Sequence, residues 1–294
     1  MTYQDKISSA HLIGNFANGS PEWHELRARG IGGSEVGTIC GLNPWESAYT
    51  LAAKKLGKIS AEIPTSEAME WGTRLEAVII DKFADEHPDL TIHRNVGTWA
   101  HNDRAWQIAN PDALYEAPDG SLGLIEVKTA RYEDAWANGV PPHYQAQVQW
   151  YLQTLGLQHA TVIVLFSGSK YREFQLDADQ FEWGMNLAAV EEFKKFVDNG
   201  NMPDFSAPMA STYETVRQEH PQIDPDGEVE VGTLGNLYYQ AIAEVALAEE
   251  AANRIRSEIL AAMGKAKRGL VGGEWKFTRQ ARNGGTPYLV QKKG

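Results

Sequence analysis

The residues with the clearest chemical use are two carboxylates and a lysine between Asn110 and Lys128. Asp112 follows a proline, while Glu126 and Lys128 stand two positions apart at the end of a largely apolar run. Crowded carboxylates raise each other's pKa unless a cation lies between them, and their oxygens suit Mg²⁺ or Mn²⁺. A nearby lysine could orient water or stabilise charge on a phosphate. The pattern therefore indicates metal-assisted phosphate chemistry, with a solvated surface Glu-Lys pair as the alternative.

These residues need a hairpin to bring them together. The turn residues Pro118-Asp119-Gly120 separate two β-prone stretches, which predicts two short antiparallel strands. Glu126 and Lys128 then share one face, because side chains alternate along a strand. Asp112 joins them only if it lies opposite 126 or 128, so paired positions must sum to 238 or 240.

Other polar residues stand at places where a ligand could reach them. Ser34 follows Gly32-Gly33 and precedes helix-forming residues, so it is either a phosphate-binding turn or a plain N-cap. Glu76 shares the apolar face of a helix predicted from Ser66 to Glu86, where its carboxylate needs a metal, an arginine or water. Gln147 belongs to a helix predicted from Pro142 to Gly156, and its neighbouring glutamines also suit a polar flank.

Composition places limits on the class of protein. The 294 residues are 43% hydrophobic and 22% charged, which is typical of a soluble protein. Cys40 is the single cysteine, so an intrachain disulfide and a cysteine-ligated zinc or iron–sulfur site are excluded. No apolar run is long enough for a signal peptide or a membrane span, so we expect a cytoplasmic protein without a membrane partner. The net charge of -12 means that any nucleic-acid binding must depend on a local group of cations.

The order of predicted elements indicates the fold class. Helices come first, then strands around the hairpin, a helix, two strands at 160–167 and 171–176, and a helix at 179–199. We therefore expect an α/β (α+β) fold with a mixed central sheet flanked by helices. Residues 1–200 would form this domain, and the proline-containing segment 201–232 would be a linker.

Residues 233–294 are predicted to form an accessory helix and hairpin. Apolar side chains recur at heptad-like steps from Leu234 to Ala262, and Gly264 ends the helix. Two β-prone stretches, 270–280 and 288–291, then flank Asn283-Gly284-Gly285. The tip is rich in lysine and arginine, so we expect this appendage to bind DNA or a partner.

Several segments together resemble the lambda exonuclease and YqaJ-like viral recombinase nucleases of the PD-(D/E)xK superfamily. The resemblance spans roughly residues 21–200. The matching motifs, in order, are Trp23-His24-x-Leu26-Arg27, Ser34-Glu35-Val36, Trp71-Gly72-x-x-x-Glu76, Pro111-Asp112 with Glu126-Val127-Lys128, and Tyr144-x-x-Gln147-Val148-Gln149. The resemblance implies a restriction-endonuclease-like core.

The resemblance also implies roles for individual residues. Asp112, Glu126 and the backbone carbonyl of Val127 would bind a first Mg²⁺, and Glu76 would help to hold a second. Lys128 would position or activate the attacking water, and Gln147 would orient that water or its neighbours. The terminal 5′-phosphate would be held by Arg27 and Ser34, with Arg29 as a competitor for Arg27.

The function expected from this resemblance is metal-dependent, ATP-independent 5′→3′ exonuclease digestion of duplex DNA in phage-type recombination. No Walker motif is present for ATP. An endonuclease or repair nuclease with the same core is one alternative, and a non-catalytic DNA-binding scaffold is another. The expected partners are double-stranded DNA ends and a single-strand annealing protein. The tail has no counterpart in the short lambda enzyme, so the ring-trimer assembly and the oligomeric state stay open.

Overall fold

The computed structural model describes residues 2–16, 19–61, 66–205 and 209–292. The chain divides into two compact units, Met1–Gln222 and Ile223–Gly294. The N-terminal unit carries every residue of the predicted nuclease site, whereas the C-terminal unit contains one long helix and a small sheet. The two units are described separately below.

The main sheet of the N-terminal unit has five strands in the order β3-β6-β7-β8-β9. Only β7 and β8 run parallel, and the other neighbours are antiparallel. The mixed sheet agrees with the predicted fold class. Its strands are β3 Thr91–Arg94, β6 Ala113–Glu116, β7 Leu122–Ala130, β8 His159–Phe166 and β9 Lys170–Asp177.

A second, four-stranded sheet was not foreseen from the sequence. Its order is β1-β4-β5-β2, with β2 and β5 parallel. Two of its strands have only two and three residues, which is too short to show a period-2 pattern. The strands are β1 Ala10–Gly14, β2 Ile31–Gly32, β4 Thr98–His101 and β5 Gln107–Ala109.

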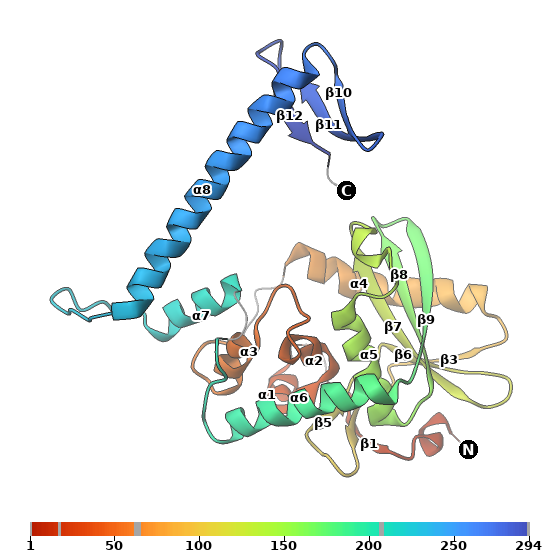
Figure 1. The fold of residues 1–294 in the computed structure, drawn as a ribbon. Helices are drawn as coiled ribbons and strands as arrows, with labels where there is room; N and C mark the ends of the chain where they lie inside the picture. The colour runs from red at the N-terminus through yellow and green to blue at the C-terminus, as the bar shows by residue number, and fades with distance from the viewer. Residues whose placement is uncertain (1, 17–18, 62–65, 206–208, 293–294) are drawn as a thin grey trace. The chain divides into compact units, whose positions relative to one another are not determined.

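Helices cover both faces of the five-stranded sheet (Figure 1). On one face, Ile79, Ile80 and Phe83 of α4 pack on Ile125 and Ile163. On the other face, α5 packs Val148, Trp150 and Leu152 into the larger core. The helices of this unit are α1 Pro21–Arg29, α2 Gly33–Ile39, α3 Ala48–Lys55, α4 Glu67–Glu86, α5 Pro142–Leu155, α6 Gln180–Asp198 and α7 Ala210–Glu219, with short 3₁₀ turns at Tyr3–Lys6 and Asp134–Trp136.

The predicted linker 201–232 is not irregular throughout. It contains α7, and the N-terminal unit extends to Gln222 rather than to residue 200. Residues 206–208 of the predicted linker lie outside the described residues. The helix α7 packs on α3 through hydroxyl groups: Thr215 lies 2.8 Å from Thr50, and Thr212 donates to Ser47 over 2.7 Å. An apolar-periodicity test misses such a helix because its buried side chains are threonines.

The C-terminal unit consists of α8 Gly232–Met263 and a three-stranded antiparallel sheet of β10 Arg268–Val271, β11 Glu274–Gln280 and β12 Tyr288–Gln291. The prediction of a single strand over 270–280 was wrong. Gly272 and Gly273 both adopt positive φ and form a tight turn between β10 and β11. The apolar seam predicted on α8 contains no buried residue among those described in this helix.

Candidate active site

The hairpin of β6 and β7 has the register that places Asp112 opposite Glu126. Ala113 pairs with Ile125 and Glu116 with Leu122, so paired positions sum to 238. Asp112 directly precedes β6, and its Oδ2 accepts a hydrogen bond of 2.7 Å from the backbone N–H of Val127. The carboxylate therefore occupies the edge of β7 where the pairing with β6 ends.

Glu126 is the most buried polar group of the hairpin, with 2% of its surface exposed. Its Oε1 accepts hydrogen bonds from Lys128 Nζ and from Gln147 Nε2, each 2.6 Å long. Lys128 Nζ also donates to Gln147 Oε1 over 3.2 Å. Strand β7 and helix α5 thus bring together three of the residues predicted from sequence.

The second carboxylate oxygen of Glu126, Oε2, is buried and has no hydrogen-bond partner in the structure. A buried, unpaired carboxylate oxygen costs free energy, and such an atom is a candidate ligand for a cation. Burial and the neighbouring Glu126 raise the pKa of Asp112 well above its ordinary value. The same two causes raise the pKa of Glu76 on α4. Concentrated negative charge is therefore the main electrostatic feature of this site.

This donor set fits a hard divalent cation. It combines carboxylates from β7, from α4 and from the start of β6, and a cation would offset the repulsion that raises their pKa values. Among the residues that the structure describes, no three His, Cys, Asp or Glu side chains stand close enough to hold a metal ion as arranged. Lys128 instead neutralises one oxygen of Glu126, with Nζ 2.6 Å away. Metal binding by Asp112, Glu126, Glu76 and the Val127 carbonyl stays a prediction.

Lys128 remains a cation in this setting. Burial alone would lower its pKa, but Glu126 and Asp112 outweigh burial, so that its pKa lies above the ordinary value. Its ammonium also lies over the ring of Tyr144, 4.7 Å from the centroid. A protonated lysine held in this way can stabilise negative charge and position a water, but it must lose its proton before it can act as a base.

Arg27 and Ser34 also lie together. Arg27 donates to Ser34 Oγ over 3.1 Å, and its guanidinium lies 3.1 Å from Glu35 Oε1. Arg29 differs, because its side chain is 80% exposed and, among the described residues, pairs with Glu25 one helical turn away. Between the two arginines that the sequence left open, Arg27 is the one that lies beside Ser34.

Glu35 contacts Arg27 and holds it beside Ser34. It was not singled out as a site residue from sequence. Its buried carboxylate accepts from the backbone N–H of Gly32 over 2.8 Å and pairs with Lys55 at 3.0 Å. Lys55 also donates to the carbonyls of Arg27 and Gly30. Burial alone would raise the pKa of Glu35, but the charges of Arg27 and Lys55 outweigh it and hold the pKa below its ordinary value. The contact between positions 35 and 55 is tertiary, and no local spacing indicates it.

The helices α2 and α5 approach closely because α2 begins with glycine. A Cβ at Gly33 would lie 2.5 Å from a ring carbon of Tyr151 and 3.0 Å from the Gln147 carbonyl. The ring of Tyr151 therefore lies beside Gly33, next to Ser34. Its hydroxyl lies 3.4 Å from Nε2 of Gln147, which contacts Glu126. Burial first, and then Glu126 and Asp112, raise the pKa of Tyr151, whereas Arg27 acts in the opposite direction. The phenol stays protonated and lies within electrostatic reach of both clusters.

Tyr151 was also missed from the sequence, although a signal existed. It lies four residues after Gln147, so the two share one helix face. The nearby His143 has a buried Nε2 without a hydrogen-bond partner, and burial together with Lys128 lowers its pKa. These shifts favour the neutral imidazole of His143 and the neutral phenol of Tyr151.

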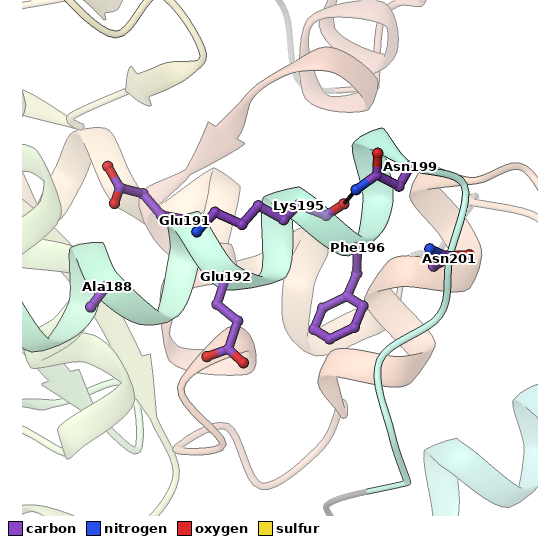
Figure 2. Close-up of a pocket in the computed structure, with 7 residues that line it drawn as sticks. All are labelled: Ala188, Glu191, Glu192, Lys195, Phe196, Asn199 and Asn201. Carbon is purple, nitrogen blue, oxygen red and sulfur yellow. Dashed lines mark hydrogen bonds between the residues drawn. The ribbon is translucent and has the colours of Figure 1, made fainter.

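Two hollows on the described part of the N-terminal unit are not lined by Asp112, Glu126, Lys128 or Gln147. One lies along α6 and is lined by Ala188, Glu191, Glu192, Lys195, Phe196, Asn199 and Asn201 (Figure 2). Its amide and carboxylate groups lie on one helix and its end, and Asn199 donates back to the Lys195 carbonyl over 2.8 Å. None of the predicted site residues lines it. Arg29 lines a second hollow, beside Lys55 and Phe193.

This chain shares its mixed α/β fold with a solved alkaline exonuclease. The structure of LHK-Exo, an alkaline exonuclease from Laribacter hongkongensis, in complex with dAMP superposes with a TM-score of 0.50 and 20% identity, over 61% of this chain and 93% of that one. Residues 22–158 match the family model of the YqaJ-like viral recombinase domain. This segment of the chain is therefore similar to the YqaJ-like viral recombinase domain.

Two curated relatives are similar to parts of this chain. The YqaJ protein of Bacillus subtilis (strain 168) is 29% identical over 180 residues, which is 58% of this chain and 54% of that protein. Protein D345L of African swine fever virus (isolate Tick/South Africa/Pretoriuskop Pr4/1996) is 29% identical over 153 residues, 44% of each chain. The chain thus spans about half the length of the curated relatives that it matches. In the described residues, no helix has the length and apolar character needed to cross a membrane.

Proposed function

We propose that this protein is a metal-dependent, ATP-independent 5′→3′ exodeoxyribonuclease that digests duplex DNA from its ends in phage-type recombination. The observation that carries the proposal is the convergence of Lys128 and Gln147 on Glu126 Oε1, with Asp112 opposite on the same hairpin. The YqaJ-like domain and the fold shared with an alkaline exonuclease support the same activity.

Asp112, Glu126, Glu76 and the Val127 carbonyl are the groups that would hold Mg²⁺, or Mn²⁺ in its place, as two ions. Such ions, when bound, supply the positive charge that stabilises the attacking and leaving oxygens of phosphodiester hydrolysis. Lys128 positions the attacking water and balances negative charge. Gln147 holds Lys128 and Glu126 through its two amide atoms, which keeps both groups in one orientation.

Arg27 and Ser34 would bind the terminal 5′-phosphate. A guanidinium and a hydroxyl 3.1 Å apart offer several donors to one phosphate group. Glu35 holds the guanidinium in place, and Tyr151 packs on Gly33, next to Ser34, while its hydroxyl lies 3.4 Å from Gln147 Nε2. A terminal phosphate bound here would fix the position of the chain end relative to Glu126. The product strand would then be available to a single-strand annealing protein, the partner that we propose for this activity.

The decisive experiment uses linear duplex DNA labelled at either the 5′ or the 3′ end. With Mg²⁺, we expect mononucleotides to be released from the 5′-phosphorylated end, and we expect EDTA to abolish the release. A 5′-hydroxyl duplex should be digested more slowly. Nicking of covalently closed circles at a similar rate would support an endonuclease instead. A complete lack of hydrolysis with Mg²⁺ and Mn²⁺, with DNA binding retained, would support the non-catalytic scaffold.

A further inference from the structure

The small sheet of the C-terminal unit has two faces of different character. Thr278 pairs with Arg268 on one side and with Val290 on the other, so these three side chains project from one face. A bulge between Gly269 and Leu270 places Trp275 opposite Leu270, on this same face. Phe277 pairs with Gly269 on the opposite face.

The face that carries Phe277 packs against the end of α8. A Cβ at Gly269 would lie 3.1 Å from the sulfur of Met263 and from Phe277. Arg279, also on this face, donates to the carbonyl of Gly264 at the end of the helix. One face of the sheet is therefore used to attach it to the helix within the unit (Figure 1). The other face, with Trp275, is left open.

On the open face, two cations lie over the ring of Trp275. The guanidinium of Arg268 is 4.5 Å from the centre of the indole ring, and Lys292 Nζ is 4.9 Å from it. The ring itself is fixed, because its Nε1 donates to the Phe277 carbonyl over 2.9 Å and to Thr278 Oγ1 over 3.0 Å. It is still 37% exposed. We call Arg268, Trp275 and Lys292 the tip cluster.

The charge around the tip cluster is opposite to that of the whole chain. Residues 264–292 hold seven lysines and arginines and one acid, Glu274, in a chain with a net charge of -12. The acid pairs with Lys276 at 2.7 Å. An exposed cationic surface in an acidic protein attracts a polyanion locally, even though the chain as a whole would repel it.

We propose that the tip cluster binds single-stranded DNA. Arg268 and Lys292 would turn from the indole ring to neighbouring phosphates, and Trp275 would stack on a base in their place. Such cationic and aromatic contacts are how proteins bind single strands without reading their sequence. A duplex would use the two cations but not the ring, because its bases are already stacked inside the helix. The aromatic ring beside the two cations therefore favours single-stranded DNA over duplex DNA as the ligand. The source of that strand rests on the proposed function, since 5′→3′ digestion of a duplex leaves one.

The test measures binding of a fluorescent oligo-dT 20-mer to the full chain by anisotropy, in EDTA so that no cleavage occurs. The double variant Arg268→Ala/Lys292→Ala should reduce the slope of log K against log salt by about 1.4, at about 0.7 per lost contact to a single strand. Trp275→Leu should weaken binding about tenfold with an unchanged slope, and Trp275→Phe should retain most of the affinity. The matched control Arg254→Ala/Arg256→Ala removes two exposed cations from α8 and should bind like the wild type.

Three results would overturn the proposal. The first is a wild-type salt slope in the Arg268→Ala/Lys292→Ala variant. The second is an equal decrease of the salt slope in the α8 control. The third is that Trp275→Leu weakens the binding of a hairpin-capped duplex as much as the binding of oligo-dT. Circular dichroism and thermal unfolding establish that each variant is folded. Digestion of a short 5′-phosphorylated duplex with Mg²⁺ is followed in parallel. If neither the wild type nor any variant digests DNA but the binding results are as expected, the proposed function is wrong and the proposal that the tip cluster binds single-stranded DNA is supported.

Discussion

Lys128 Nζ lies 2.6 Å from Glu126 Oε1, two residues earlier on the same face of β7. Both side chains are largely buried, with 17% and 3% exposed, so neither charge is strongly screened by water. Gln147 contacts both partners from α5. The pair is therefore fixed from two elements.

Substitutions at Lys128, at Glu126 and at the neighbouring Asp112 should abolish cleavage. We expect Asp112→Ala, Glu126→Ala and Lys128→Ala each to lower the rate of duplex digestion by at least about 10²-fold, because each removes a main electrostatic group of the site. DNA binding in EDTA should be largely retained. The control Lys170→Ala removes an exposed lysine that pairs with Glu133, and should cleave normally. Near-wild-type cleavage by one of the three variants would remove that residue from the mechanism.

Arg27 and Arg29 form a natural comparison, because they lie two residues apart on α1. Arg27→Ala should slow the digestion of 5′-phosphorylated ends much more than that of 5′-hydroxyl ends, since the lost contact is to the phosphate. Arg29→Ala should leave the ratio of the two rates unchanged, because Arg29 is exposed and its ion pair is with Glu25 one helical turn away. If the two variants changed the ratio equally, or Arg29→Ala changed it more, Arg27 would not be the phosphate-binding residue.

Gly33→Ala tests the close approach of α2 and α5. The new methyl group would meet the Tyr151 ring at 2.5 Å, so we expect a loss of about 1–3 kcal/mol in the free energy of unfolding, together with slower cleavage as Gln147 shifts. Gly184→Ala on α6 has no atom within 4 Å of the new methyl and should be neutral or up to about 1 kcal/mol stabilising. Urea unfolding of both variants measures the difference. Equal stabilities would mean that the two helices can separate without cost.

Truncation tests the boundary at Gln222. A protein ending at residue 222 keeps α7 and should unfold with nearly the stability of the N-terminal unit in the full chain. A protein ending at residue 201 loses the partners of Ser47 and Thr50 in the core and should be less stable by about 1–3 kcal/mol or more, because buried hydroxyls are left unsatisfied. Hydrolysis of short duplexes at low salt should survive the first truncation. Inactivity of a folded 1–222 protein would show that the C-terminal unit belongs to the active domain.

The sequence predicted the hairpin well because strand periodicity and loop parity allow few registers. The fixed alternation of side chains left two sums for paired positions, and the structure has one of them. The same reasoning failed at Gly272-Gly273, where a two-residue turn lies inside a stretch taken as one strand. It failed again at α7, whose contacts are made by hydroxyl groups rather than by an apolar stripe.

Candidate residues were predictable where a local motif contained them. Glu126, Lys128 and Gln147 belong to short motifs, and the structure brings them into contact. Lys55 could not be found in this way, because its role depends on a carboxylate 20 positions away in the sequence and 3.0 Å away in space. Tyr151 could have been found from its helical spacing to Gln147 alone.

The contacts of Glu35 limit which amino-acid substitutions this protein can accept at positions 27, 35 and 55. One carboxylate forms ion pairs with both Arg27 and the buried Lys55 and also accepts from the Gly32 amide. The effects of substitutions at 27, 35 and 55 are therefore coupled and will not add. Loss of Glu35 leaves the buried ammonium of Lys55 without its carboxylate partner. Loss of Lys55 alone leaves a carboxylate that would compete with a bound phosphate for Arg27. A lineage that exchanges the proposed recognition of a 5′-phosphate for another specificity must therefore alter these positions together, or pass through an intermediate that folds poorly.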